Sequence, residues 1–289
     1  MTYPAGPPTP PPHPGGPSGP PAVCVRHRDR PTGLSCTRCG RPACPQCLRE
    51  AAVGYQCVDC VNEGRRGVRR GTTVAGAEPG RRPVVVPALI GLNLAIYVWT
   101  VVQAGSINGN AASDLFAEWA LVPTYVQGGE WWRIVTSGFL HIGLIHLVFN
   151  MWALWVLGRD MEMVLGRVRF LAVYLVSMLG GAAAVMLFSP ALVPVAGASG
   201  AVFGLMGGIA VVLRKMRMSP GQAIGLIVVN LVISFIIPGI SIAGHIGGLV
   251  VGAALTAAMV YAPAANRTTV QTTAVAGLTA LLLVVIALV

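Results

Sequence analysis

The sequence predicts an all-α, polytopic membrane protein preceded by a small polar domain. Hydrophobic residues make up 54% of the 289 residues and charged residues only 10%, whereas a soluble domain carries about 25% charged residues. The mean hydropathy is +0.69. All seven cysteines lie between Cys24 and Cys60, before the first long apolar stretch. A cysteine-containing head followed by a helical membrane domain accounts for all of these observations.

Composition divides the chain into five parts. Residues 1–22 are rich in Pro, Gly and Ser, so we expect a disordered tail that buries no core. Residues 23–62 hold the cysteines, and residues 63–83 form a basic linker. Residues 84–262 contain six apolar spans, and residues 263–289 contain a seventh. The start of the chain has neither a basic segment nor an apolar run, so we expect no cleavable signal peptide and a cytoplasmic N-terminus.

Cysteine and histidine occur in four consecutive pairs, each with two residues between its members. The pairs are Cys24-x2-His27, Cys36-x2-Cys39, Cys44-x2-Cys47 and Cys57-x2-Cys60. Each pair suits one edge of a tetrahedral zinc site, so the eight ligands predict two structural zinc ions. Disulfides and unligated thiols are the weaker interpretations in the reducing cytoplasm. We expect no catalytic zinc, because eight ligands leave neither ion an open position.

The spacing of these pairs resembles small B-box-like or ribbon-type zinc modules. Sequential and cross-braced sharing of the pairs both fit the pattern. We expect such a module either to have a purely structural role or to dock a cytoplasmic partner.

Charge predicts the topology of the membrane part. The basic linker directly before the first span contains six arginines, at positions 65, 66, 69, 70, 81 and 82. Such a run marks the cytoplasmic side and favours anionic lipid headgroups, and we expect no nucleic-acid partner. We expect spans at about 84–104, 138–158, 168–188, 199–213, 221–237, 241–261 and 270–289. Basic loops then lie inside, the C-terminus lies outside, and the expected location is the plasma membrane.

The stretch around Ser199 predicts a reactive serine. Gly197 and the residues around it are small, and an apolar run continues from Gly200 to Leu213. This pattern places Ser199 at the start of a membrane helix, where unpaired N–H groups could stabilise an oxyanion. Serine is also a favoured helix N-cap, and small residues are common where membrane helices pack, so this stretch alone does not establish catalysis.

The distribution of acidic residues excludes several kinds of catalysis. The last acidic residue is Glu162, and the acids of the membrane part lie in loops or at span ends in this interpretation. Paired intramembrane aspartates and a His-Glu-x-x-His zinc site are absent from the sequence. A transporter with a carboxylate relay is disfavoured for the same reason. A serine–histidine pair without an aspartate remains.

The chemistry of such a pair assigns a role to each candidate residue. His245 would act as the general base for Ser199, which would form an acyl-enzyme. The oxyanion would be held by the Ser199 N–H, with His146 and Asn150 as donors on one face of the second span. A packing histidine and an interhelical amide hydrogen bond are the alternatives for these side chains. Gly248 and Gly252 would let the sixth span approach the fourth closely, bringing Ser199 to His245.

Together these motifs resemble the rhomboid family of intramembrane serine proteases, over residues 84–262. The resemblance rests on Trp132-Arg133, His141-x4-His146-x3-Asn150, Gly197-Ala-Ser199-Gly and Gly244-His245-x2-Gly248-x3-Gly252. It implies a six-helix bundle, here with a seventh helix, and a Ser199–His245 dyad that cleaves single-pass membrane proteins from the outer side. Phe203 stands where many bacterial members have tyrosine, and we expect its ring to stack on His245.

Two other functions are possible for this sequence. A catalytically idle relative could bind membrane proteins as a scaffold, although such relatives typically lack one member of the pair. A channel or transporter could use the polar residues to line a path. Serine-directed fluorophosphonate labelling of Ser199 distinguishes the protease from both.

Overall fold

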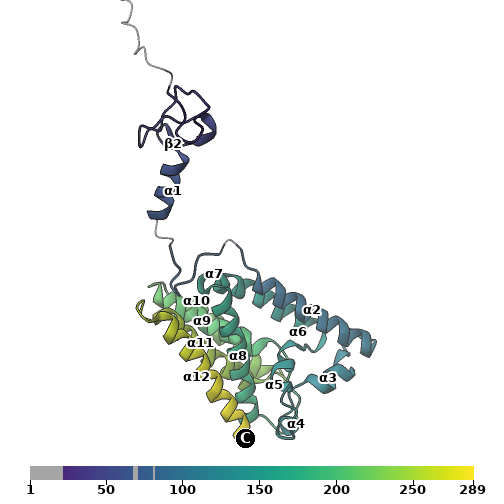
Figure 1. Ribbon diagram of the computed structural model, residues 1–289. Coiled ribbons are helices and arrows are strands. Elements are labelled where there is room, and N and C mark those ends of the chain that lie inside the picture. The colour runs from purple at the N-terminus through teal and green to yellow at the C-terminus, as the bar shows by residue number, and fades with distance from the viewer. Residues whose placement is uncertain (1–21, 68–70, 81) are drawn as a thin grey trace, which may run out of the picture. The chain divides into compact units, whose positions relative to one another are not determined.

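The computed structural model describes residues 22–67, 71–80 and 82–289. The chain forms two compact units, Met1–Arg70 and Gly71–Val289, and each is described by itself (Figure 1). The tail expected over residues 1–22 lies outside the described residues, apart from Ala22.

The described part of the first unit is a small module with little regular structure. The 3-10 turn η1 (Pro45–Cys47) leads into β1 (Leu48–Glu50), which pairs antiparallel with β2 (Tyr55–Cys57), and α1 (Val58–Gly67) follows. The buried core consists of six cysteines with Ala43 and Leu48. Domains of about 40 residues have too little apolar core to fold without cross-links or metals, and this one has few core residues other than cysteine.

Helices dominate the second unit, and every region expected to span the membrane contains helix. In chain order the spans are α2 (Val85–Ala104), α6 (Gly143–Ala153) with the π-helical turn η4 (Leu154–Gly158) and α7 (Arg159–Leu165), α8 (Arg167–Phe188), α9 (Ser199–Lys215), α10 (Gly221–Ile236), α11 (Ile242–Tyr261) and α12 (Arg267–Leu288). Between α2 and α6 lie η2 (Asn110–Ala112), α3 (Asp114–Trp119), α4 (Pro123–Gln127), α5 (Arg133–Thr136) and η3 (Ser137–Phe139).

Four of these helices are long and apolar enough to cross a membrane unaided: α2, α8, α11 and α12. The helices α9 and α10 are shorter, with 17 and 16 residues. The protein is therefore an all-α membrane protein with a small cysteine-rich module before it, as the sequence predicts.

The second span differs from the predicted range of 138–158. Arg133–Phe139 and Gly143–Leu165 are instead two helical segments bent by 91°. Gly143 has φ +71, a left-handed conformation that glycine adopts without strain, and the new helix begins there. His146 therefore lies in the first turn of α6, directly after the break.

Glu162 lies in α7, near the end of the second span, which is one of the two places expected for it, and its side chain is buried. Its carboxylate accepts the backbone N–H groups of Val84, Val85 and Val86, at 2.7, 3.0 and 2.9 Å. These donors include the first N–H groups of α2, which have no partner within their own helix. A negative charge at a helix N-terminus is also stabilising. Glu162 thus fixes the start of the first span.

The helices α8, α9 and α11 pack together in the core of the unit, as Figure 1 shows. A β-carbon at Gly248 would overlap the backbone of Gly200, and one at Gly252 would overlap the backbone of Gly204. The close approach of the fourth and sixth spans, expected from these glycines, is confirmed. It brings the first turns of α9 and α11 next to each other.

Residues 71–80, expected as linker, pack on the membrane unit. The Gln271 amide of α12 donates to the carbonyls of Ala75 and Met259, at 3.0 and 2.8 Å. Arg169 of α8 donates to the Gln271 side-chain oxygen at 2.7 Å. One buried glutamine therefore joins α12, α11 and α8 to the segment before the first span.

Candidate active site

Ser199 is the first residue of α9 and is partly exposed. The chain reaches it through a backbone bridge between Leu121 and Val195, and Gly197 N–H donates to the carbonyl of Ser137 at 2.9 Å. Gly197 has φ +135, which a side chain rarely allows. The turn places the Ser199 hydroxyl beside the first N–H groups of the helix, which lack intrahelical acceptors.

His245 lies within hydrogen-bond distance of Ser199. Its Nε2 is 2.8 Å from the serine Oγ, and its ring is buried at 7% exposure. Ser241 caps the start of α11 by accepting the Gly244 N–H at 3.1 Å, which anchors the turn that carries His245. The structure thus brings together the two residues that the sequence pairs as nucleophile and base.

Phe203 covers one face of the His245 ring. The two ring centroids are 4.1 Å apart and the planes are inclined by 15°. Phe203 is four residues after Ser199, so the same turn of α9 presents the hydroxyl and the stacking ring. The expected stacking is confirmed, and it restricts the tilt of the imidazole.

Ser234 of α10 also contacts His245, and the sequence analysis did not identify it. Its Oγ is 2.7 Å from His245 Nδ1. Ser234 is the buried residue of α10, a helix whose other side chains are partly or fully exposed. A lone hydroxyl in an apolar span was the only available signal, and nothing in the sequence relates it to a histidine on the next helix.

His146 lies on the other side of the serine. A β-carbon at Gly197 would lie 2.9 Å from His146 Cε1, 3.0 Å from Nε2 and 3.6 Å from the Ser199 Oγ. The Nδ1 of His146 accepts the backbone N–H of Ile142 at 3.3 Å. A neutral imidazole that accepts at Nδ1 carries its proton on Nε2. His146 therefore directs an N–H donor at the space beside Gly197.

Asn150 is buried one turn after His146, on the same face of α6. Its amide donates to the His146 carbonyl at 3.0 Å, so one of its two N–H groups has a partner within the helix. His141, which belongs to the same motif, is buried with its ring centroid 5.2 Å from that of His146. Among the described residues no hydrogen-bond partner is found for either ring nitrogen of His141.

The eight cysteine and histidine residues of the first unit form two separate clusters. One contains Cys24, His27, Cys44 and Cys47, and the other contains Cys36, Cys39, Cys57 and Cys60. Within each cluster all ligand atoms lie within 4.8 Å of one another. The first and third pairs share one cluster and the second and fourth pairs share the other, so the arrangement is cross-braced rather than sequential.

The distances within the clusters fit tetrahedral metal sites. His27 Nδ1 is 3.9, 3.4 and 3.3 Å from the sulfurs of Cys24, Cys44 and Cys47, and the sulfurs of Cys39 and Cys57 are 3.8 Å apart. A tetrahedral zinc ion has ligand–ligand edges of about 3.6–3.8 Å, given its bond lengths. These residues can therefore hold two metal ions.

Backbone donors favour the thiolate form of two ligands. The N–H of Cys44 lowers the pKa of Cys24 to about 6, and the N–H of Cys57 lowers the pKa of Cys36 to about 6. Burial and the neighbouring sulfurs raise the pKa of Cys47 to about 11. Several thiolates close together repel one another. A divalent cation bound among them would offset this repulsion, because metal ions bind cysteine in the thiolate form.

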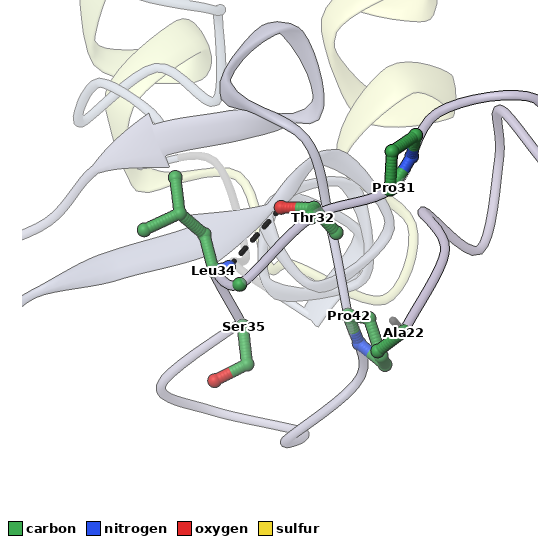
Figure 2. Close-up of a pocket in the computed structure, with 7 residues that line it drawn as sticks. Ala22, Pro31, Thr32, Leu34, Ser35 and Pro42 are labelled. Carbon is green, nitrogen blue, oxygen red and sulfur yellow. Dashed lines mark hydrogen bonds between the residues drawn. The ribbon is translucent and has the colours of Figure 1, made fainter. Parts of the chain in front are cut away.

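The same module carries a shallow hollow of about 460 Å³ (Figure 2). It is lined by Ala22, Pro31, Thr32, Gly33, Leu34, Ser35 and Pro42. Figure 2 shows the hydrogen bond between two of these residues, in which the Leu34 N–H donates to the Thr32 hydroxyl at 3.1 Å. None of the eight cluster ligands lines it, so it forms no part of either cluster.

The second unit is thus a helical membrane domain with a serine–histidine pair at the starts of two tightly packed helices. Residues 128–262 match the rhomboid domain family model. The chain therefore carries a rhomboid domain.

Individual relatives agree with this assignment. Rhomboid protease GluP of Bacillus subtilis (strain 168) is 36% identical over 192 residues, covering 65% of this chain and 37% of that protein. RHOMBOID-like protein 4 of Arabidopsis thaliana is 34% identical over 137 residues, covering 45% of this chain and 34% of that protein. Rhomboid protease AarA of Providencia stuartii is 29% identical over 204 residues, covering 61% of this chain and 72% of that protein. The chain thus spans little more than a third of the length of the first two relatives.

Proposed function

We propose that the protein is an intramembrane serine endopeptidase that cleaves single-pass transmembrane proteins. The observation that carries this proposal is the 2.8 Å contact between Ser199 Oγ and His245 Nε2 at the starts of α9 and α11. The match to the rhomboid domain supports it. Lipids are the surrounding partners of such a protein.

The reaction would proceed through an acyl-enzyme. His245 Nε2 takes the proton of the Ser199 hydroxyl while Oγ attacks the scissile carbonyl carbon. The imidazolium then gives this proton to the leaving amine as the C–N bond breaks. A water molecule, deprotonated by the same nitrogen, releases the acyl group and restores the serine.

Three donors are assigned to the oxyanion in this proposal. The Ser199 N–H belongs to the first turn of α9 and points along the helix axis. His146 directs Nε2–H at the space beside Gly197, and Asn150 has a second amide N–H beyond the one bound to the His146 carbonyl. Removal of one such donor costs about 100- to 1000-fold in kcat in other serine proteases.

The test is cleavage of a single-pass substrate in liposomes by the full chain, compared with Ser199→Ala and His245→Ala. Loss of cleavage in both variants supports the dyad, and mass spectrometry of the products gives the cut site. Equal cleavage by all three proteins would contradict the proposal.

The alternative is a catalytically idle scaffold that binds membrane proteins. The short Ser199–His245 contact disfavours it, because an idle protein has no need of this geometry. Fluorophosphonate labelling tests the two directly. Labelling of wild-type protein that is absent in Ser199→Ala supports the enzyme, and absence of labelling in both supports the scaffold.

We assign two structural zinc ions to the clusters of the N-terminal module, which we take to be B-box-like. In the proposed topology this module is cytoplasmic, and the C-terminus and the opening of the site lie on the outer side of the plasma membrane. The module then docks a cytoplasmic partner or the lipid surface and is dispensable for cleavage. Deletion of residues 1–70, the first compact unit, tests this, and a well-folded but inactive deletion would contradict it.

A further inference from the structure

Ser234 is a buried hydroxyl that the proposed mechanism does not use. It is 3% exposed and lies near the C-terminal end of α10, which ends at Ile236. Its oxygen contacts two groups: the carbonyl of Asn230, at 2.7 Å, and His245 Nδ1, also at 2.7 Å. The first contact is the usual bond of a helical serine to the carbonyl four residues earlier.

The number of protons on these groups determines the direction of each hydrogen bond. A serine hydroxyl has one proton, and a carbonyl oxygen can only accept. Because the Ser234 proton is directed at the Asn230 carbonyl, the Ser234 oxygen must accept from His245. The proton of the neutral imidazole therefore resides on Nδ1. Its Nε2 then has a free lone pair, and this is the nitrogen 2.8 Å from Ser199 Oγ.

We propose that Ser234 is a positioning residue that holds His245 in the tautomer able to accept the Ser199 proton. The chain of bonds runs from the Ser199 hydroxyl to His245, from His245 to Ser234, and from Ser234 to the Asn230 carbonyl. In a Ser-His-Asp triad an aspartate accepts the Nδ1–H of the histidine. This sequence has no acidic residue after Glu162, and the Ser234 oxygen accepts the Nδ1–H of His245 instead. Ser234 touches neither the substrate nor the reacting atoms.

The same hydroxyl acts again when the base becomes charged. When Nε2 takes the Ser199 proton, the ring carries a positive charge and the Nδ1–H becomes a stronger donor. A hydrogen bond from a charged donor is shorter and stronger than a neutral one, and the Ser234 oxygen is already placed to accept it. Phe203 fixes the tilt of the ring and Ser234 fixes its rotation about the Cβ–Cγ bond.

This contact also makes the base depend on the position of α10. The helix buries one residue against the rest of the unit, and that residue is the partner of His245. A displacement of α10 that removed Ser234 would allow the ring to take the other tautomer. Nε2 would then carry a proton and could no longer accept from Ser199.

The tautomer can be measured in the full-length protein without any substrate. Histidine labelled with 15N in lipid bicelles reports by NMR which ring nitrogen carries the proton, and the signals missing in His245→Ala identify this residue. We expect Nδ1–H in the wild type and a mixture in Ser234→Ala. An Nε2–H tautomer in the wild type would overturn the inference.

Kinetics supply the second measurement, and this part rests on the proposed function. Loss of one neutral hydrogen bond to the base predicts a fall in kcat of about 10-fold for Ser234→Ala, with KM nearly unchanged. Ser234→Thr should recover most of the rate, because a helical threonine hydroxyl also bonds the carbonyl four residues earlier. Val232→Ala, on the exposed side of the same helix, is the matched control. A kcat of Ser234→Ala equal to that of the wild type would overturn the inference.

The NMR and activity measurements test the role of Ser234 and the protease activity separately. A wild type that neither cleaves nor takes up a fluorophosphonate contradicts the protease proposal, while the NMR result still decides the tautomer. Where Ser234→Ala fails to fold, Ser234→Cys keeps the volume and replaces the oxygen with a weak acceptor, and the same expectations apply.

Discussion

Gly197 lies so close to His146 that a β-carbon at this position would come within 2.9 Å of His146 Cε1 and 3.0 Å of Nε2. The glycine also has φ +135, a region that side chains rarely enter. Absence of a side chain is therefore needed twice here, once for the backbone turn before Ser199 and once for the imidazole beside it.

Gly197→Ala should strongly reduce cleavage with a much smaller effect on folding. The methyl group would displace the His146 ring and strain the turn that carries Ser199, and a displaced donor beside an oxyanion costs about 10- to 100-fold in kcat. Cleavage rate and fluorophosphonate labelling measure the effect. Gly277→Ala is the control, because a β-carbon there meets no atom within 4 Å. Equal rates for both variants would show that the His146 ring does not need this space.

Phe203→Leu should slow the reaction by weakening the restraint on His245. The stacked pair has a centroid separation of 4.1 Å, and such aromatic pairs contribute about 0.5–1.5 kcal/mol beyond their buried area. We expect a fall in kcat of about 3- to 10-fold in liposome cleavage assays. Phe203→Tyr retains a stacking ring and should stay closer to the wild type. A leucine variant faster than the tyrosine variant would argue against a role for stacking.

The regular helices of the membrane unit could be predicted from the sequence because each is an apolar segment of its own. The bounds of α8 and α11 agree with the predicted spans to within one residue at each end. The break before Gly143 could not be predicted in the same way, because residues 138–142 are themselves largely apolar and no proline marks the bend. A left-handed glycine is a conformational feature, and composition does not reveal it.

The site was predictable where short motifs place reactive groups at helix starts, and not where contacts join distant elements. Ser199 and His245 follow from glycine-rich motifs whose packing brings α9 to α11. The contact of Glu162 with Val84 crosses 78 residues, and that of Ser234 with His245 joins two helices. Both depend on how the helices pack, which one sequence does not contain.

Glu162→Gln should destabilise the membrane unit. The carboxylate accepts three N–H groups at the start of α2, whereas an amide has one oxygen and would direct its NH2 group at donors. We expect a loss of about 1–3 kcal/mol in the free energy of unfolding, from the lost charge at the helix N-terminus and the unpaired donors. Thermal unfolding in detergent measures it. Asp160→Asn is the control, because that side chain is 71% exposed on the same helix.

Metal analysis of paired cysteine variants tests the cross-braced clusters. The full-length protein should bind two zinc ions, and Cys24→Ser combined with Cys44→Ser should remove one, because both ligands belong to the same cluster. Cys24→Ser combined with Cys36→Ser should remove both, since each cluster then keeps three ligands. Sequential pairing predicts the reverse, because Cys24 and Cys36 would share one ion and Cys44 would belong to the other. Zinc content measured by mass spectrometry after dialysis against a weak chelator therefore distinguishes the two arrangements, and a wild type that retains no zinc would contradict both.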